Sequence, residues 1–232
     1  GVKRARAIFV LSNQMKWEVR KLYGKEAMVL KGAFPSEIFN YKPQQDMKHR
    51  LAVHDKKIIL SVCRLAPKKR VDLLIKAFKK VSQRFNDVIL VIGGVGQKEE
   101  KFKKLAIRLN IAGKVEFVGY IKEEELWDYY TSCDVFAHPD HADFAIAPYE
   151  ALALQKNVVW STEMEVDEIL ANNRHIFVAE PTTDAFAQAI EKALATNVTE
   201  ENDLSCYTWD KYFEAILEQL YLVNRSRFQK ET

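Results

Sequence analysis

Four cationic side chains lie in one short turn between a predicted strand and a predicted helix. Arg64, Lys68, Lys69 and Arg70 follow the apolar run Ile58–Val62, and a helical pattern begins directly after them. Free N–H groups and the positive dipole end of a helix N-terminus attract anions, and these cations add full charges. The turn is therefore a candidate phosphate or diphosphate site, with Arg64 and Lys69 as its strongest members. A merely solvated surface is the alternative, above all for Lys68 and Arg70.

A carboxylate, Glu150, stands at the start of another predicted helix. Pro148 suits the first turn of that helix, because its missing N–H would have no intrahelical partner there. A glutamate in a first turn often only complements the helix dipole. The same carboxylate could instead accept two hydrogen bonds from a ribose diol. Position alone leaves both roles open.

Two further motifs must be considered, one as a metal site and the other as a dinucleotide site. The segment His138–Asp143 holds two imidazoles and two carboxylates, which suit zinc or manganese. Because no distant residue completes a ligand set, a polar loop is the better interpretation. Gly93, Gly94 and Gly96 follow a strand, but the third glycine of a dinucleotide fingerprint would fall at Glu99. We expect a tight turn at which backbone approaches a ligand or the next helix.

Composition excludes several classes of protein. The chain has 232 residues and a net charge of +3, which is too balanced for a nucleic-acid binder that relies on phosphate contacts. Cys63, Cys133 and Cys206 are too few and too far apart for a disulfide framework or a zinc knuckle. The sequence shows no long apolar run and no signal-peptide pattern. We therefore expect thiols in a reducing compartment and a cytoplasmic protein without a transmembrane segment.

Apolar runs alternate with helical patterns along most of the chain. Unbroken apolar runs fit strands that are buried on both faces. Repeated strand–helix units predict an α/β fold with a doubly wound parallel sheet of the Rossmann type and a site at the carboxyl ends of the strands. The predicted strands are Ala7–Leu11, Ile58–Val62, Val88–Ile92, Val115–Val118, Val135–His138, Asn157–Ser161 and His175–Val178. The polar segment 40–56 interrupts this rhythm and is interpreted as a linker.

Four blocks of the chain, in order, carry a family resemblance. They are the basic turn and helix at 61–78, the glycine turn at 90–96, the segment 115–121 and the segment 144–153. Together they resemble the nucleotide-sugar half of the family 4 (group 1) retaining glycosyltransferases. The resemblance implies the GT-B architecture, in which two Rossmann-like domains face each other across a cleft.

The resemblance implies roles for individual residues. Arg64 and Lys69 would bind the donor diphosphate and stabilise it as the leaving group, and Glu150 would grip the ribose. Transfer in this family retains configuration by front-face attack and uses no metal, so no cofactor is expected. The other implied donor-binding positions, for sugar, phosphate and base, are Asp143, Phe144, Ala145, Ile146, Gly119, Tyr120 and Ile121.

The chain also departs from the family pattern. Ala142 stands where the first of two paired glutamates is expected. Ala145 stands where the family has a glycine, and its Cβ would leave less room for the backbone to come close to the donor. These departures keep two alternatives open. One is a degenerate nucleotide-binding regulatory module, and the other is a sugar-nucleotide epimerase of GT-B architecture.

The resemblance also predicts the domain organisation. Residues 1–45 would be the end of an acceptor domain with its linker, 46–206 the donor-binding domain, and 207–232 a helix that crosses back to the acceptor domain. We expect the chain to bind GDP-mannose, as in a mannosyltransferase, or a UDP-sugar. A saccharide or lipid-linked acceptor would need the N-terminal domain or a partner chain, so the isolated chain should not transfer sugar. The full-length enzyme would be cytoplasmic or at the membrane surface.

Overall fold

The computed structural model describes residues 2–142, 144–198 and 203–228, with side chains up to Leu222. The chain forms two compact units. The larger one comprises Ile38–Ala142 and Ala147–Asn202, and the smaller one comprises Gly1–Glu37, Asp143–Ile146 and Asp203–Thr232. The domain bounds expected from the sequence remain a prediction.

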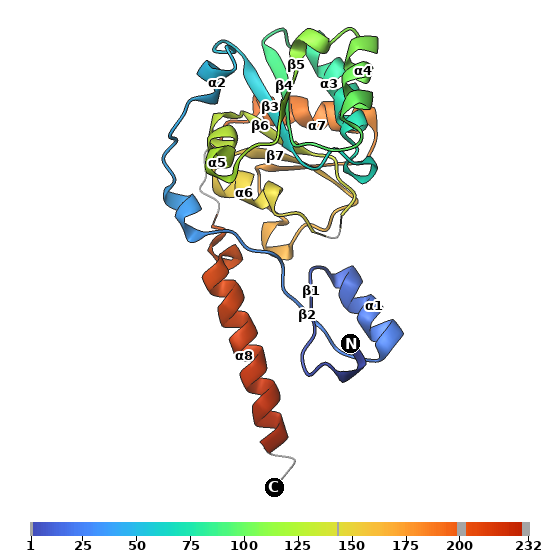
Figure 1. Ribbon diagram of the computed structural model, residues 1–232, viewed down its shortest axis with the longest axis vertical. Coiled ribbons are helices and arrows are strands. Elements are labelled where there is room, and N and C mark those ends of the chain that lie inside the picture. The colour runs from blue at the N-terminus through green and yellow to red at the C-terminus, as the bar shows by residue number, and fades with distance from the viewer. Residues whose placement is uncertain (1, 143, 199–202, 229–232) are drawn as a thin grey trace. The chain divides into compact units, whose positions relative to one another are not determined.

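A six-stranded parallel sheet forms the centre of the larger unit and confirms the predicted fold class (Figure 1). The strand order is β5-β4-β3-β6-β7-β8. The strands are β3 Lys57–Val62, β4 Val88–Gly93, β5 Val115–Gly119, β6 Val135–His138, β7 Asn157–Ser161 and β8 Ile176–Ala179. Strands β4, β6 and β7 are buried along their whole length, which explains why apolar residues dominate them; the polar exceptions are His138 in β6 and Asn157 and Ser161 in β7.

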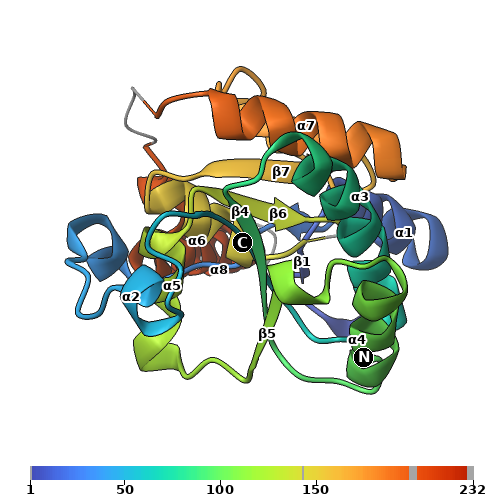
Figure 2. The same ribbon diagram turned by 90° about the horizontal axis from the view of Figure 1, so that it is seen from above.

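Helices cover both faces of this sheet (Figure 2). On one face lie α3 Val71–Arg84, α4 Glu99–Arg108 and α7 Thr183–Ala195. On the other face lie α5 Glu123–Ser132 and α6 Ala147–Ala153. Short 3-10 turns occur at Val2–Arg4, Ser36–Asn40, Pro67–Lys69, Ala112–Lys114, Glu168–Leu170 and Ser205–Tyr207.

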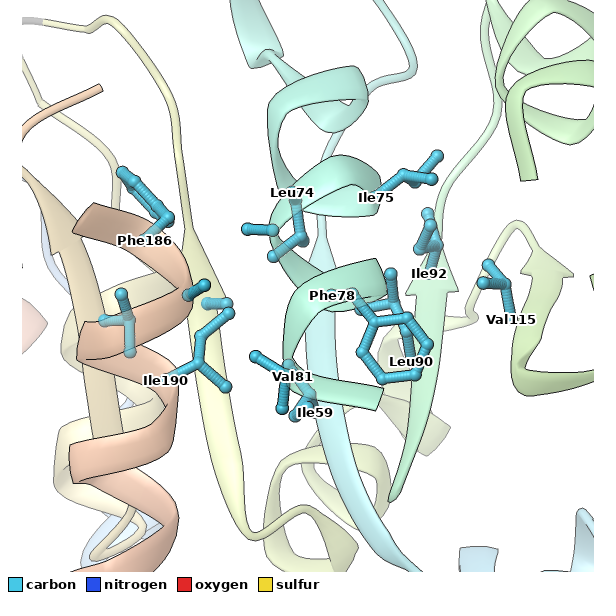
Figure 3. Packing of buried hydrophobic residues seen from close by; sticks show 14 of the residues in the cluster. Ile59, Leu74, Ile75, Phe78, Val81, Leu90, Ile92, Val115, Phe186 and Ile190 are labelled. Carbon is cyan, nitrogen blue, oxygen red and sulfur yellow. The ribbon is translucent and has the colours of Figure 1, made fainter. Parts of the chain in front are cut away.

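The apolar stripe of α3 anchors the basic turn that precedes this helix. Val71, Leu74, Ile75, Phe78 and Val81 recur at helical spacing, and all five are fully buried. Burial of a large apolar side chain stabilises the fold by about 1.5–3 kcal/mol. The first turn of α3 is therefore held rigidly on the sheet. Figure 3 shows the partners of this stripe, which are Ile59, Leu90, Ile92, Val115, Phe186 and Ile190.

The order of the strands creates a switch point between β3 and β6. From β3 the chain adds β4 and then β5 on one side, and then returns to place β6 on the other side of β3. The connections after β3 and β6 therefore leave the carboxyl ends of these two strands in opposite directions. In open α/β sheets this is where ligands bind.

The polar segment interpreted as a linker is packed on α5. It contains the short helix α2, Met47–Arg50. The Tyr41 hydroxyl donates a 2.8 Å hydrogen bond to Asp128, and the Gln44 N–H donates a second one of 2.8 Å to the same carboxylate oxygen. The Tyr41 ring also packs edge-on against Trp127. Hydrogen bonds thus hold residues 41–50 on α5, although no apolar pattern in this segment indicated packing.

The smaller unit contains two short parallel strands and two helices. Strands β1 Phe9–Val10 and β2 Met28–Val29 pair with each other, and α1 Asn13–Tyr23 connects them. Helix α8, Trp209–Phe228, follows a bridge in which backbone groups of Phe34 bond to Tyr207 and Trp209. Several of its large apolar side chains are exposed, namely Trp209, Phe213, Leu217, Leu220, Tyr221 and Leu222. No helix in the described part of the chain is long and apolar enough to cross a membrane.

Candidate functional site

The basic turn occupies the carboxyl end of β3, at the switch point. After β3 the chain buries Leu65, makes the 3-10 turn Pro67–Lys69, and begins α3 at Val71. Arg70 links the two helical segments in the left-handed conformation, with φ 47°. Its carbonyl accepts the first hydrogen bonds of α3 from Leu73 and Leu74. The cations and the N-terminus of α3 therefore lie together, as the sequence predicted.

Lys69 forms an ion pair with a carboxylate from the neighbouring strand. Its ammonium group bonds to Asp140, two residues beyond the end of β6. The Asp140 side chain is 1% exposed and the Lys69 side chain 22% exposed, so the pair is largely shielded from solvent. The pair connects the loops that follow β3 and β6.

His138 is the third member of this buried cluster. Its Nε2 lies 3.5 Å from Asp140 Oδ2, and its side chain is 3% exposed. Burial lowers the pKa of His138 and outweighs the opposing effect of Asp140. Burial alone would raise the pKa of Asp140, but its contacts with His138 and Lys69 hold it below its usual value. At neutral pH the cluster therefore contains a neutral imidazole, a carboxylate and an ammonium.

A second ion pair neutralises Arg70. Both terminal nitrogens of its guanidinium bond to the Glu163 carboxylate in the loop after β7, one of them at 2.9 Å. By contrast, Arg64 and Lys68 are exposed, and among the described residues neither side chain forms an ion pair or hydrogen bond. Of the four cations, Arg64 and Lys68 thus keep their full charge for a ligand, while Lys69 and Arg70 share theirs with carboxylates.

The glycine turn after β4 packs against the backbone that leads from β3 into the basic turn. Leu65 N–H bonds to Val95 O at 3.0 Å, and Cys63 N–H bonds to Gly93 O at 3.1 Å. Gly94 has φ 117°, and a Cβ at this residue would meet the Cys63 carbonyl oxygen. The predicted tight turn is therefore confirmed, but its close approach is to the backbone of the basic turn and not to the next helix.

Glu150 lies in the first turn of α6 and is mostly buried. Its Oε2 accepts a 3.2 Å hydrogen bond from the Tyr130 hydroxyl, and Tyr130 is fully buried. Burial raises the pKa of Glu150, against the opposing effects of Tyr130 and Trp127. The Tyr130 ring packs edge-on against Phe136, which stacks on His138. A row of buried side chains thus links Glu150 to the Lys69–Asp140 pair.

The remaining predicted donor contacts fall into different parts of the chain. At the end of β5, Gly119 has φ 71°, Tyr120 is 73% exposed, and Ile121 is buried. Phe144–Ile146 belong to the smaller unit, where the Phe144 ring would clash with a Cβ on Gly32. The predicted contact Asp143 lies outside the described residues.

Sequence reasoning missed the roles of Asp140 and Tyr130. The available signal for Asp140 was its position directly after a strand that neighbours the basic turn. The sequence predicted a polar loop at 138–143, but assigned no role to Asp140 in it. Within the described part of the chain, no three His, Cys, Asp or Glu residues are grouped so that they could hold a metal ion.

Comparisons with known proteins point to one family. A family model described as "Glycosyl transferases group 1" matches residues 43–208. The chain is 27% identical over 221 residues to an uncharacterized glycosyltransferase of Methanocaldococcus jannaschii, covering 88% of this chain and 56% of that protein. It is 25% identical over 167 residues to a phosphatidylinositol N-acetylglucosaminyltransferase subunit of Saccharomyces cerevisiae, covering 72% of this chain and 37% of that subunit. The chain therefore spans about half or less of these relatives.

Solved structures show the same fold. The crystal structure of Anabaena HepE in complex with UDP-glucose superposes with a TM-score of 0.82 at 18% sequence identity. The match covers 95% of this chain and 65% of that one.

Proposed function

The chain belongs to the glycosyl transferases group 1, a family of transferase enzymes, and we propose that its larger unit is the donor site of a retaining sugar transfer. In this proposal a nucleoside-diphosphate sugar binds at the carboxyl ends of β3 and β6. The observation that carries the proposal is the exposed Arg64, which forms no ion pair with any described residue. It lies in the same turn as Lys69, before the N-terminus of α3 and at the switch point of the sheet.

The cations would act mainly on the leaving diphosphate. When the bond between the anomeric carbon and the diphosphate oxygen breaks, negative charge grows on that oxygen. Arg64 and Lys69 would stabilise this charge, and groups fixed in advance are most effective in this role. The acceptor oxygen bonds to the same face of the anomeric carbon, and its proton passes to the departing phosphate. No residue of this chain is needed as the base.

Glu150 would select the ribose. One carboxylate can accept hydrogen bonds from both hydroxyls of a ribose diol, and Tyr130 holds the Glu150 carboxylate in one orientation through its 3.2 Å bond. Because burial disfavours the charged form of Glu150, its carboxylate calls for hydrogen-bond donors in addition to Tyr130 and Trp127. The ribose hydroxyls would satisfy this requirement.

The acceptor and partners are proposed from the relatives. The name of the yeast relative states transfer of N-acetylglucosamine to phosphatidylinositol, and it describes that protein as a subunit. We accordingly propose a saccharide or lipid-linked acceptor. Its recognition would depend on a further domain or chain, since the archaeal relative is matched over 56% of its length. GDP-mannose and UDP-sugars are the donor classes to be compared.

A degenerate nucleotide-binding module is the second candidate, and Ala142 favours it. A methyl group stands where the resemblance implies a carboxylate, so one polar contact to the donor would be missing. Nucleotide binding without turnover in the presence of acceptor and partner domain would distinguish this module from an enzyme.

Calorimetric titration with UDP, GDP and ADP tests the donor site. We expect Arg64→Ala to weaken binding of the preferred diphosphate at least tenfold, since a charge-assisted hydrogen bond contributes about 1.5–3 kcal/mol. Lys68→Ala is the matched control. Lys68 is an exposed cation of the same turn with no ion pair among the described residues, but the family resemblance assigns it no contact with the diphosphate. Equal affinity in wild type and Arg64→Ala would refute the assignment of the site.

A further inference from the structure

The Lys69–Asp140 pair has a consequence for ligand affinity, provided that the proposed donor site is correct. A diphosphate bound by Lys69 would approach a carboxylate that is 1% exposed and cannot turn away into solvent. The carboxylate follows a fully buried strand, so its backbone is fixed. The donor would therefore compete with a permanent internal anion for the same ammonium group.

The surroundings of Asp140 offer little further compensation for its charge. The titratable groups that face it are Lys69, His138 and the thiol of Cys63. His138 is neutral at pH 7, so it supplies no positive charge, and burial raises the pKa of Cys63 to about 12, so the thiol is neutral as well. Asp140 Oδ1 is buried and has no hydrogen-bond partner within the described part of the chain. Lys69 is therefore its principal counter-ion.

We propose that Asp140 is a positioning residue of the donor site that fixes the ammonium group of Lys69 at the switch point and, through its charge, limits the affinity for the diphosphate. Two opposing effects arise from one carboxylate. The hydrogen bond orders a flexible lysine before the donor arrives, which favours binding. The negative charge repels the diphosphate, and at distances of a few ångströms such repulsion is substantial even with an effective dielectric constant of about 20.

Asparagine separates the two effects. In Asp140→Asn the side-chain oxygen can still accept a hydrogen bond from Lys69, but the negative charge is gone. We expect this variant to bind the nucleoside diphosphate about tenfold more tightly than wild type, because one repulsive charge is removed. The gain should be smaller for the nucleoside monophosphate and absent for the uncharged nucleoside. A merely structural role of Asp140 would change all three affinities in the same direction.

The chain offers a matched control at the opposite end of the same strand. Asp134 directly precedes β6 and pairs with Lys48 at 3.0 Å, and it also accepts a 2.8 Å bond from the Ile58 N–H. Asp134→Asn therefore alters another Asp–Lys pair, one whose carboxylate is 33% exposed and lies away from the carboxyl ends of the strands. We expect its affinity for all three ligands to equal that of wild type.

The experiment is calorimetric titration of wild type, Asp140→Asn and Asp134→Asn with uridine or guanosine and the corresponding mono- and diphosphates. A second comparison uses Lys69→Met and the double variant Lys69→Met/Asp140→Asn, in which removal of the charge should restore about tenfold of the lost diphosphate affinity. An unchanged or weaker diphosphate affinity in Asp140→Asn, or no restoration in the double variant, would overturn the inference. If wild type binds no nucleotide, the proposed donor site itself fails, and the two results are distinguishable.

Discussion

Replacement of Lys69 by methionine should destabilise the larger unit in a pH-dependent way. The change removes the counter-ion of the 1% exposed Asp140 carboxylate and keeps most of the side-chain volume. Removal of one partner from a buried ion pair costs about 3–5 kcal/mol. Because Lys69 is 22% exposed and water can reach the pair, we expect the lower end, about 3 kcal/mol. For a unit of this size that loss lowers Tm by about 6–12 °C.

The sign of the pH dependence follows from Asp140. In wild type its pKa is lowered in the folded state, so the carboxylate stabilises the fold above its unfolded pKa of about 4, and this contribution disappears at more acidic pH. Without Lys69, burial would raise the folded pKa instead, and the charged form would then destabilise the fold at neutral pH. The stability difference between the two proteins should therefore be largest near pH 7 and shrink as the pH falls toward 4.

Urea denaturation at several pH values between 4 and 8 measures this difference. Lys68→Met is the control, since Lys68 is exposed in the same turn, and it should lose less than about 0.5 kcal/mol. In Lys69→Met/Asp140→Asn most of the stability should return, because no buried charge is left unpaired. A loss in Lys69→Met that equals the loss in Lys68→Met, or that does not vary with pH, would refute the ion-pair reasoning.

Two further predictions concern the ribose contact and the glycine turn. Glu150→Gln should reduce the preference for ribonucleotides over 2′-deoxy and 3′-deoxy analogues by about tenfold in competition titrations. Tyr130→Phe should reduce this preference less, because only the orientation of the carboxylate is lost. An unaltered preference in Glu150→Gln would mean that Glu150 only complements the dipole of α6. Gly94→Ala should lower the free energy of unfolding by more than about 2 kcal/mol, since Gly94 has φ 117° and the added Cβ would meet the Cys63 carbonyl. In the control Gly113→Ala no atom lies within 4 Å of the added Cβ, so the free energy of unfolding should change little. Equal effects of the two substitutions in denaturant unfolding would contradict the packing of this turn.

Local sequence patterns were sufficient for the sheet and for the basic turn. The run at 88–92 is apolar along its whole length, and that at 58–62 is apolar except for the buried Ser61, because helices cover both faces of β3 and β4. The recurrence of Val71, Leu74, Ile75, Phe78 and Val81 marked the buried face of α3. These patterns depend only on neighbours in the sequence, so they can be recognised without knowledge of the strand order.

The contacts that shape the candidate site could not be predicted in this way. Lys69 and Asp140 are 71 residues apart in sequence and meet only because β6 lies beside β3. Tyr130 reaches Glu150 because α5 and α6 cover the same face of the sheet. The segment 41–50 packs on α5 through hydrogen bonds to Asp128, and polar contacts of this kind leave no periodic pattern. Strand order and polar pairing are thus the information that local patterns lacked.

A crystal structure of the chain with its preferred nucleoside diphosphate would test the central claim most directly. We predict that the diphosphate oxygens lie within about 2.7–3.2 Å of the Arg64 and Lys69 side-chain nitrogens, at the carboxyl ends of β3 and β6. The rival location is the cationic groove between α3 and α4, which Lys76, Lys101, Lys104 and Arg108 line. A diphosphate bound in that groove, with Arg64 and Lys69 free of ligand, would contradict the proposed donor site.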